Sequence, residues 1–108
     1  MGKLVELTYV FLYNNQLMGT IPTEFGLCTK MVRFYLYDNQ LSGVIPSELG
    51  TWTLLNNFRL YNNPSLGGAI PTEVQALSIP SCYLYSCNFT CVGIITNTWC
   101  DMNTDYGC

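Results

Sequence analysis

The sequence predicts a solenoid, in which short and similar coils of chain stack on one another. The main observation is a period: LYNNQLMGTIPTEFG begins at Leu12, LYDNQLSGVIPSELG at Leu36 and LYNNPSLGGAIPTEV at Leu60, so the copies start 24 residues apart. A fixed period of this length is typical of repeat proteins, in which each unit contacts only its neighbours. Composition agrees, because 49% of the residues are hydrophobic and only 10% are charged, as expected when apolar side chains stack inward.

Within each unit, apolar residues recur at fixed positions before an Asn or a Cys. They are Leu7, Val10, Leu12 and Asn15, then Met31, Phe34, Leu36 and Asn39, then Leu55, Phe58, Leu60 and Asn63, and in a weaker fourth copy Ile79, Cys82, Leu84 and Cys87. This is the pattern of leucine-rich repeats, L-x-x-L-x-L-x-x-N/C. The continuation L-x-G-x-I-P at residues 41–46 resembles the plant-type extracellular subclass, found in plants and in algae such as diatoms.

The resemblance implies a leucine-rich repeat solenoid of about four coils, with a parallel β-sheet on its concave face. The strands are expected near residues 10–12, 34–36, 58–60 and 82–84, one in each coil. Because parallel strands need a crossover, a return segment must follow each strand. We assign the repeats to residues 1–87 and a cysteine-rich C-terminal cap to residues 88–108.

The N-terminal cap is missing from this plan, because Leu4 already stands at the repeat position of Cys28 and Trp52, whose side chain is expected to point inward from the return segment. An uncovered end exposes the stacked core of a solenoid. We therefore expect either that the natural N-terminus lies upstream, or that a partner chain or further repeats cover this end. The face in question carries Leu4, Leu7, Val10 and Leu12.

The Asn of each unit is expected to stabilise the turn after the strand. Asn15, Asn39 and Asn63 recur in register and should form a ladder that satisfies backbone groups, since an unpaired buried polar group costs about 1–3 kcal/mol. On the return segments, Thr23, Ser47 and Thr72 are expected to cap helical turns begun by Glu24, Glu48 and Glu73. A cation site at these Glu side chains is less favoured than a solvated face, because no second column of ligands accompanies them.

The outward strand positions carry an aromatic column, because side chains alternate between the two faces of a strand. One column reads Tyr13, Tyr37, Tyr61 and Tyr85, and its neighbour reads Phe11, Tyr35, Arg59 and Tyr83. Strands lie about 4.8 Å apart, so the strip spans about 14 Å. It predicts a ligand-binding face, since Tyr and Arg are favoured anchors. The alternative is structural, because cross-strand aromatic pairs stabilise a sheet by themselves.

The last 27 residues contain five of the six cysteines. Dense cysteine in a short segment indicates disulfides and an oxidising compartment, so a secreted or extracellular location, or another oxidising lumen, is expected. Cys28 and Cys82 are interpreted as buried thiols, which leaves two bridges among Cys87, Cys91, Cys100 and Cys108, with three pairings open. Zinc is less favoured, because the chain has no C-x-x-C pair and no His.

Asn88 begins the sequon Asn-Phe-Thr, which is a glycosylation candidate on a secretory route. The net charge of −3 argues against binding nucleic acid, and no apolar run reaches the ~20 residues that span a membrane. No catalytic site, metal site or cofactor site is predicted, because His is absent and the acids outside the Glu column are scattered.

The sequence therefore predicts a non-enzymatic recognition module that binds a protein, a peptide or a glycan through its tyrosine face. The alternative is a structural subunit that docks into a larger assembly through its N-terminal end and its aromatic face. An ice-binding surface is the least favoured hypothesis, because Val44 and Ala69 interrupt the column that starts at Thr20.

Overall fold

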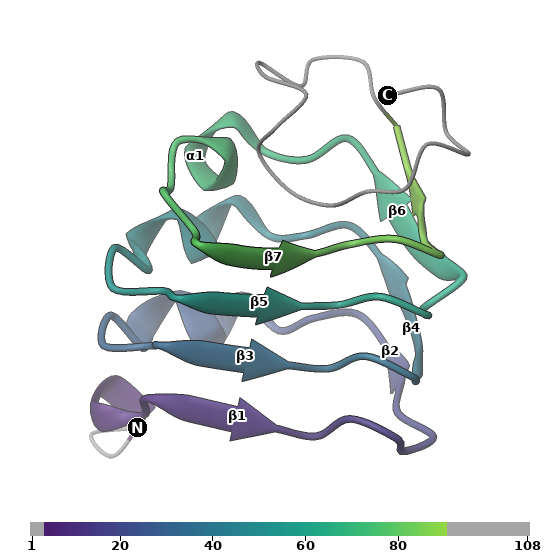
Figure 1. Cartoon of the computed structure of the whole chain (residues 1–108), viewed down its shortest axis with the longest axis horizontal. Coiled ribbons are helices and arrows are strands. Elements are labelled where there is room, and N and C mark those ends of the chain that lie inside the picture. The colour runs from purple at the N-terminus through teal and green to yellow at the C-terminus, as the bar shows by residue number, and fades with distance from the viewer. Residues whose placement is uncertain (1–3, 91–108) are drawn as a thin grey trace.

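Four short strands lie side by side along one face of the molecule (Figure 1). In this computed structural model, which describes residues 4–90, they form one parallel sheet in the order β1-β3-β5-β7. The strands are β1 (Tyr9–Phe11), β3 (Arg33–Tyr35), β5 (Asn57–Arg59) and β7 (Ser81–Tyr83). Val10 pairs with Phe34, and Phe34 with Phe58, so the register follows the sequence period. The predicted parallel sheet is confirmed, with each strand starting one residue earlier than expected.

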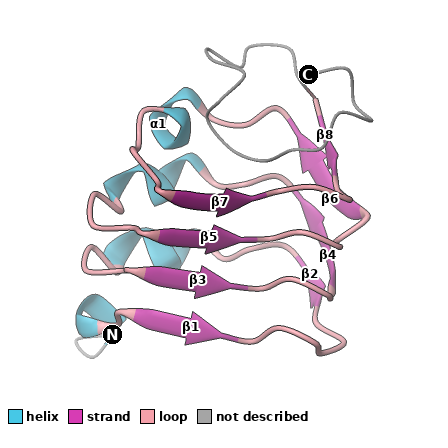
Figure 2. Cartoon of the chain, in the orientation of Figure 1, coloured by secondary structure: helices cyan, strands magenta, loops and turns pink. Residues whose placement is uncertain are grey.

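A second parallel sheet follows the turns, and the sequence analysis did not predict it (Figure 2). Its order is β2-β4-β6-β8, and its strands have only two to four residues each. They are β2 (Met18–Gly19), β4 (Gln40–Gly43), β6 (Ser65–Gly68) and β8 (Asn88–Phe89). Strand β8 lies at the start of residues 88–108, the segment that the sequence analysis assigned to the cap.

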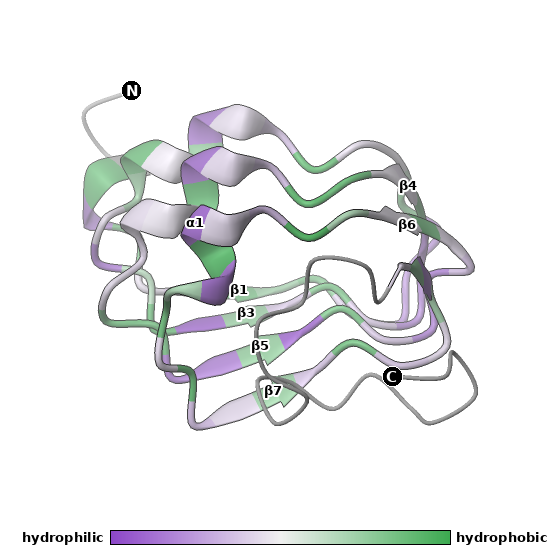
Figure 3. Cartoon of the chain, turned by 90° about the horizontal axis from the view of Figure 1, so that it is seen from above, coloured by the Kyte–Doolittle hydropathy of each residue, from purple (hydrophilic) through white to green (hydrophobic). Residues whose placement is uncertain are grey.

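The third side of each coil is a short helical turn, and Figure 3 shows these turns lying across from the first sheet. They are η1 (Leu4–Glu6), η2 (Thr23–Leu27), η3 (Ser47–Thr51) and α1 (Thr72–Gln75). The expected hydroxyl caps are wrong, because the capping position of η2 is occupied by Pro22 and no side chain bonds there. The Thr23 hydroxyl instead donates to Glu24 Oε1 at 3.1 Å. It lies inside the first turn, one residue past the position from which a side chain caps a helix.

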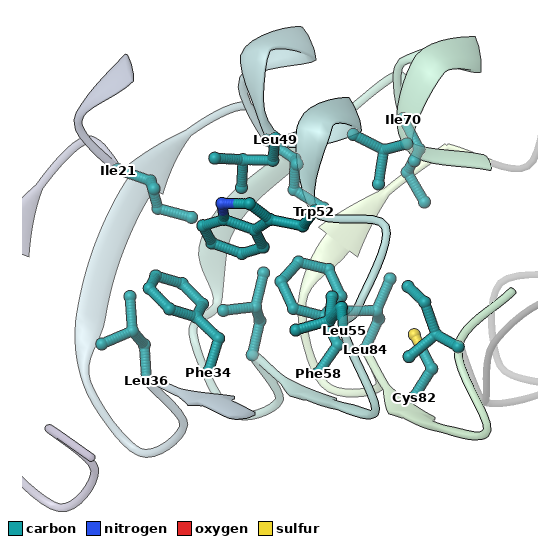
Figure 4. Packing of buried hydrophobic residues seen from close by; sticks show 14 of the residues in the cluster. Ile21, Phe34, Leu36, Leu49, Trp52, Leu55, Phe58, Ile70, Cys82 and Leu84 are labelled. Atoms are coloured by element: carbon teal, nitrogen blue, oxygen red, sulfur yellow. The ribbon is translucent and has the colours of Figure 1, made fainter. Parts of the chain in front are cut away.

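The core fills the space between the three sides, and Trp52 lies near its centre (Figure 4). Its ring packs against Phe34 at 4.8 Å and against Phe58 at 6.3 Å between ring centroids. Its Nε1 donates to the Phe25 carbonyl at 2.9 Å, which satisfies the one polar atom of the ring. Trp52 is 1% exposed, so its predicted inward position is confirmed.

The asparagine ladder is confirmed at its two inner steps. Asn63 Nδ2 donates to the Leu36 and Leu60 carbonyls at 3.0 and 2.8 Å, and Asn63 Oδ1 accepts from the Leu41 N–H at 3.0 Å. Asn39 makes the same contacts one coil earlier. The exposed Asn15 bonds only to carbonyls of its own coil. Each inner Asn therefore joins two coils, whereas Asn15 closes only its own turn.

Cys87 takes the Asn position of the fourth coil, and there the structure differs from the expected cysteine assignment. Cys87 is a free, buried thiol whose Sγ donates to the Leu60 carbonyl at 3.1 Å, as Asn63 Nδ2 does to Leu36. Cys82, expected to be a thiol, is disulfide-bonded, and neither Cys28 nor Cys87 is its partner. Cys28 is free and buried, as expected. The other cap cysteines, Cys91, Cys100 and Cys108, lie outside the described residues.

The Cys87 thiol should make stability fall in alkaline solution. Burial raises its pKa from 9.0 to about 11, so the unfolded chain loses this proton first as the pH rises. Its contribution is complete below pH 9 and is lost towards pH 11. We expect the chain to lose about 2 kcal/mol more unfolding free energy than Cys87→Ser between pH 8 and pH 11, as measured by urea unfolding. Equal losses in the two proteins would contradict a protonated, buried Cys87.

Candidate functional site

The tyrosines at the C-terminal end of each strand form a continuous stack across the first sheet. Ring centroids lie 4.7 Å apart for Tyr13 and Tyr37, 4.4 Å for Tyr37 and Tyr61, and 4.6 Å for Tyr61 and Tyr85. The planes of adjacent rings differ by only 4–14°. These spacings match the distance between neighbouring strands, so each ring lies flat on the next. We call these four residues the tyrosine stack.

Stacking determines which atoms of these rings can meet a ligand. Both faces of Tyr37 and of Tyr61 are covered by neighbouring rings, so their accessible parts are ring edges and hydroxyl groups. Burial, reinforced by the nearby Tyr37 and Tyr85, raises the pKa of Tyr61 to about 12. Its hydroxyl is therefore protonated at physiological pH and can donate a hydrogen bond.

The neighbouring column alternates rings with a cation. Phe11 packs against Tyr35 at 4.8 Å, and the Arg59 guanidinium lies over Tyr35 at 4.6 Å and over Tyr83 at 5.4 Å from the ring centroids. Arg33, two residues before Tyr35 on β3, lies over the Tyr9 ring at 5.4 Å from its centroid. The structure thus brings the predicted tyrosines and Arg59 onto one sheet face. Strand alternation alone was enough to predict this grouping.

A column of left-handed residues borders the tyrosine stack, and the sequence analysis missed it. Asn14, Asp38, Asn62 and Ser86 follow the four tyrosines and have φ between 54° and 59°. Asn and Asp tolerate this conformation better than most residues, which is the signal that was available in the sequence. Asn62 Nδ2 donates to Asp38 Oδ1 at 2.7 Å. The Asp38 carboxylate, which lies at the rim of the site, is therefore already hydrogen-bonded.

The comparisons with known proteins agree with the repeat fold. The family model described as "Leucine Rich Repeat" matches residues 6–28 and 30–52. The chain contains leucine-rich repeats. No curated protein sequence matches it.

Three solved structures resemble the chain. The plant peptide hormone receptor RGFR1 in complex with RGF2 has 31% identity, a TM-score of 0.75, and coverage of 80% of this chain and 14% of that one. The structure of PEPR1-AtPEP1 has 39% identity and a TM-score of 0.72, and the match covers 78% of this chain and 12% of that one. The BIR3 - SERK2 complex from Arabidopsis thaliana has 27% identity and a TM-score of 0.64, and the match covers 70% of this chain and 41% of that one. The chain thus spans between 12% and 41% of the length of these relatives.

Residues 4–90 also bear on metal binding, membrane insertion and glycosylation. Among residues 4–90, no three His, Cys, Asp or Glu side chains are grouped closely enough to hold a metal ion. The same part of the chain has no helix with the length and apolar character needed to cross a membrane. The sequon residue Asn88 lies in β8, and its side chain is exposed and therefore accessible. Its glycosylation stays a prediction.

Proposed function

We propose that this leucine-rich repeat segment is a non-enzymatic recognition module that binds an extended peptide or a protein loop across the tyrosine stack. The observation that carries the proposal is the row of ring edges and hydroxyls, which spans four adjacent strands. Tyr hydroxyls can both donate to and accept from backbone amides, and rigid rings lose little entropy on binding. One of the similar structures is a plant peptide hormone receptor, RGFR1, in complex with RGF2, which supports this class of ligand.

A peptide suits the stack better than a glycan. A sugar that packs on an aromatic side chain needs a free ring face, but both faces of Tyr37 and Tyr61 are covered. A peptide backbone instead needs donors and acceptors at regular intervals, and the hydroxyl row supplies them. An extended chain advances about 3.4 Å per residue, so about four residues would cross the ~14 Å of the stack. The dense cysteines and the sequon support a secreted or extracellular setting for this binding.

Docking within a larger assembly is the second candidate function, and the exposed end of the solenoid favours it. Leu12 and Met18 are 44% and 76% exposed there, although Leu36, the equivalent of Leu12 one coil later, is buried. Asn15 Oδ1 accepts no bond from the described residues, whereas Asn39 and Asn63 each accept a backbone N–H from the preceding coil. A strand from a partner, or from a further repeat, would supply that donor.

Selection from a displayed random-peptide library tests the proposed function. Peptides selected on the unmodified protein should bind the Tyr37→Ala/Tyr61→Ala variant at least about 30-fold more weakly, which corresponds to about 2 kcal/mol. The matched variant Tyr37→Phe/Tyr61→Phe keeps the stack but removes the hydroxyls, and it should account for part of this loss. Glu24→Gln/Glu48→Gln, on the opposite side of the coils, should bind as the unmodified protein does.

Three results would contradict the proposal. The first is that the selected peptides bind the tyrosine variants as tightly as the unmodified protein. The second is that peptide binding is lost in Glu24→Gln/Glu48→Gln. The third is that the protein binds a glycan array but no peptide of the library. Melting temperatures of all variants must accompany the binding data, so that a folding defect is not mistaken for a lost contact.

A further inference from the structure

The tyrosine stack holds phenol rings closer together and more nearly parallel than the other tyrosines of the same sheet face. Tyr37 and Tyr61 lie 4.4 Å apart between ring centroids, with 11° between their planes. The other tyrosine pairs in contact within residues 4–90 are 6.0–6.5 Å apart and inclined by 48–77°. In the described part of the chain, phenol rings therefore meet face to face only within the stack.

The backbone holds the central pair of rings in register. Before Tyr37, the Leu36 N–H donates to the Arg59 carbonyl at 2.9 Å. After it, the Asp38 N–H donates to the Tyr61 carbonyl at 3.1 Å. Both rings are partly exposed, so their hydroxyl groups are accessible from solvent. The pair thus combines a fixed contact with accessible reactive groups.

Contact between ring faces matters for the one-electron oxidation of tyrosine. A phenol that loses one electron and one proton becomes a phenoxyl radical, whose unpaired electron is shared between the oxygen and the ortho and para carbons. The orbital that holds this electron is perpendicular to the ring, so in a stack it points at the neighbouring ring. Two adjacent radicals form one carbon–carbon bond between ortho carbons, and the hydrogen on each of these carbons then moves to its own oxygen, which restores both phenols. The product has lost two electrons and two protons in all.

We propose that the tyrosine stack is a site of oxidative crosslinking, where a peroxidase joins neighbouring tyrosines such as Tyr37 and Tyr61 through their ortho carbons. Hydrogen peroxide takes up the two electrons and two protons and becomes two molecules of water. The new bond links coils one repeat apart and constrains the unfolded chain, as a disulfide does. The oxidising compartment expected from the cysteines suits this chemistry. The inference goes beyond the proposed function and does not depend on it.

Arg59 separates the tyrosines of the neighbouring column, which makes the proposed reaction selective. Its guanidinium lies over the Tyr35 ring at 4.6 Å and over the Tyr83 ring at 5.4 Å from the centroids. The cation takes the place of a neighbouring phenol, and its charge opposes the loss of an electron from either ring. We therefore expect no crosslink between Tyr35 and Tyr83.

Treatment of the intact chain with a peroxidase and hydrogen peroxide, in dilute solution, tests the site. We expect a monomer whose mass is lower by two hydrogen atoms and which shows the fluorescence of a biphenol. Mass spectrometry after proteolysis should place the link between adjacent tyrosines of the stack. The absence of any link, links only between molecules, or a link that joins Tyr35 or Tyr83 instead would overturn the proposal.

Two matched variants complete the test. Tyr37→Phe/Tyr61→Phe keeps the stacked rings but leaves no two adjacent phenols in the stack, so the crosslink should be lost. Tyr35→Phe/Tyr83→Phe removes the same number of phenols from the neighbouring column and should retain the crosslink. Equal crosslinking in the two variants, once their melting temperatures show that both are folded, would refute the site.

Peptide binding is measured separately on the untreated chain. If library peptides require Tyr37 and Tyr61 but no link forms, the crosslinking site is wrong and the proposed function stands. If the link forms but no peptide requires these residues, only the peptide-binding role of the stack is refuted.

Discussion

Replacing Asn63 by Ala should lower the free energy of unfolding by about 3–5 kcal/mol, because this one side chain serves three backbone groups. Asn63 is fully buried and bonds to the Leu36 and Leu60 carbonyls and to the Leu41 N–H. Alanine would leave the Leu41 N–H unpaired in the core, which costs about 1–3 kcal/mol. It would also remove one of the two side-chain hydrogen bonds that each carbonyl accepts, at about 0.5–1.5 kcal/mol each, because Leu36 also accepts from Asn39 Nδ2 and Leu60 from Cys87 Sγ. Water cannot readily replace the amide, since the surrounding core is closed. Urea unfolding followed by circular dichroism measures the loss.

Asn15→Ala is the matched control, since it makes the same substitution at the same repeat position. Asn15 is exposed and bonds only within its own coil, where water can take its place. We expect it to cost less than about 1 kcal/mol. Asn39→Ala should resemble Asn63→Ala, because Asn39 also joins two coils. Similar losses at Asn15 and Asn63 would show that the ladder does not couple the coils.

The sequence was sufficient to predict the first sheet, because its period and its register have the same origin. Residues that recur after 24 positions, such as Phe34 and Phe58, must pair when identical coils stack. The same logic predicted the inward Trp52, the asparagine ladder and the shared face of Tyr37 and Tyr61. Repetition converts sequence spacing into spatial neighbourhood, which most folds do not allow.

The second sheet escaped prediction because its strands have two to four residues and no alternation of apolar and polar side chains. β6 reads Ser-Leu-Gly-Gly and β8 reads Asn-Phe, and both pair through the backbone. The cysteines escaped for a different reason. The repeat pattern placed Cys87 at the Asn position, but only the fold shows that it is a free, buried thiol there and that its Sγ bonds to the Leu60 carbonyl. The stacking of the tyrosines likewise depends on side-chain rotation, which the spacing of Tyr37 and Tyr61 does not determine.

Trp52→Ala should be comparably destabilising, at about 3–5 kcal/mol, because it opens a cavity where the coils meet. The ring of Trp52 lies against Phe34 of the preceding coil and Phe58 of the following strand, and its Nε1 bonds to the Phe25 carbonyl. Its loss removes contacts to two coils and one of the two hydrogen bonds that the Phe25 carbonyl accepts, the other being from the Cys28 N–H. The measurement is again urea unfolding.

Two further variants distinguish the cavity from the hydrogen bond at Trp52. Trp52→Phe keeps most of the apolar contact but loses the Nε1 donor, so it should cost less than Trp52→Ala, by about half. Leu54→Ala removes a side chain two residues away that is 59% exposed, and it should cost less than about 1 kcal/mol. If Trp52→Phe were as harmful as Trp52→Ala, the bond to the Phe25 carbonyl would be the dominant contribution of Trp52. If Leu54→Ala matched them, the surface turn after η3, rather than the core, would limit the stability of the solenoid.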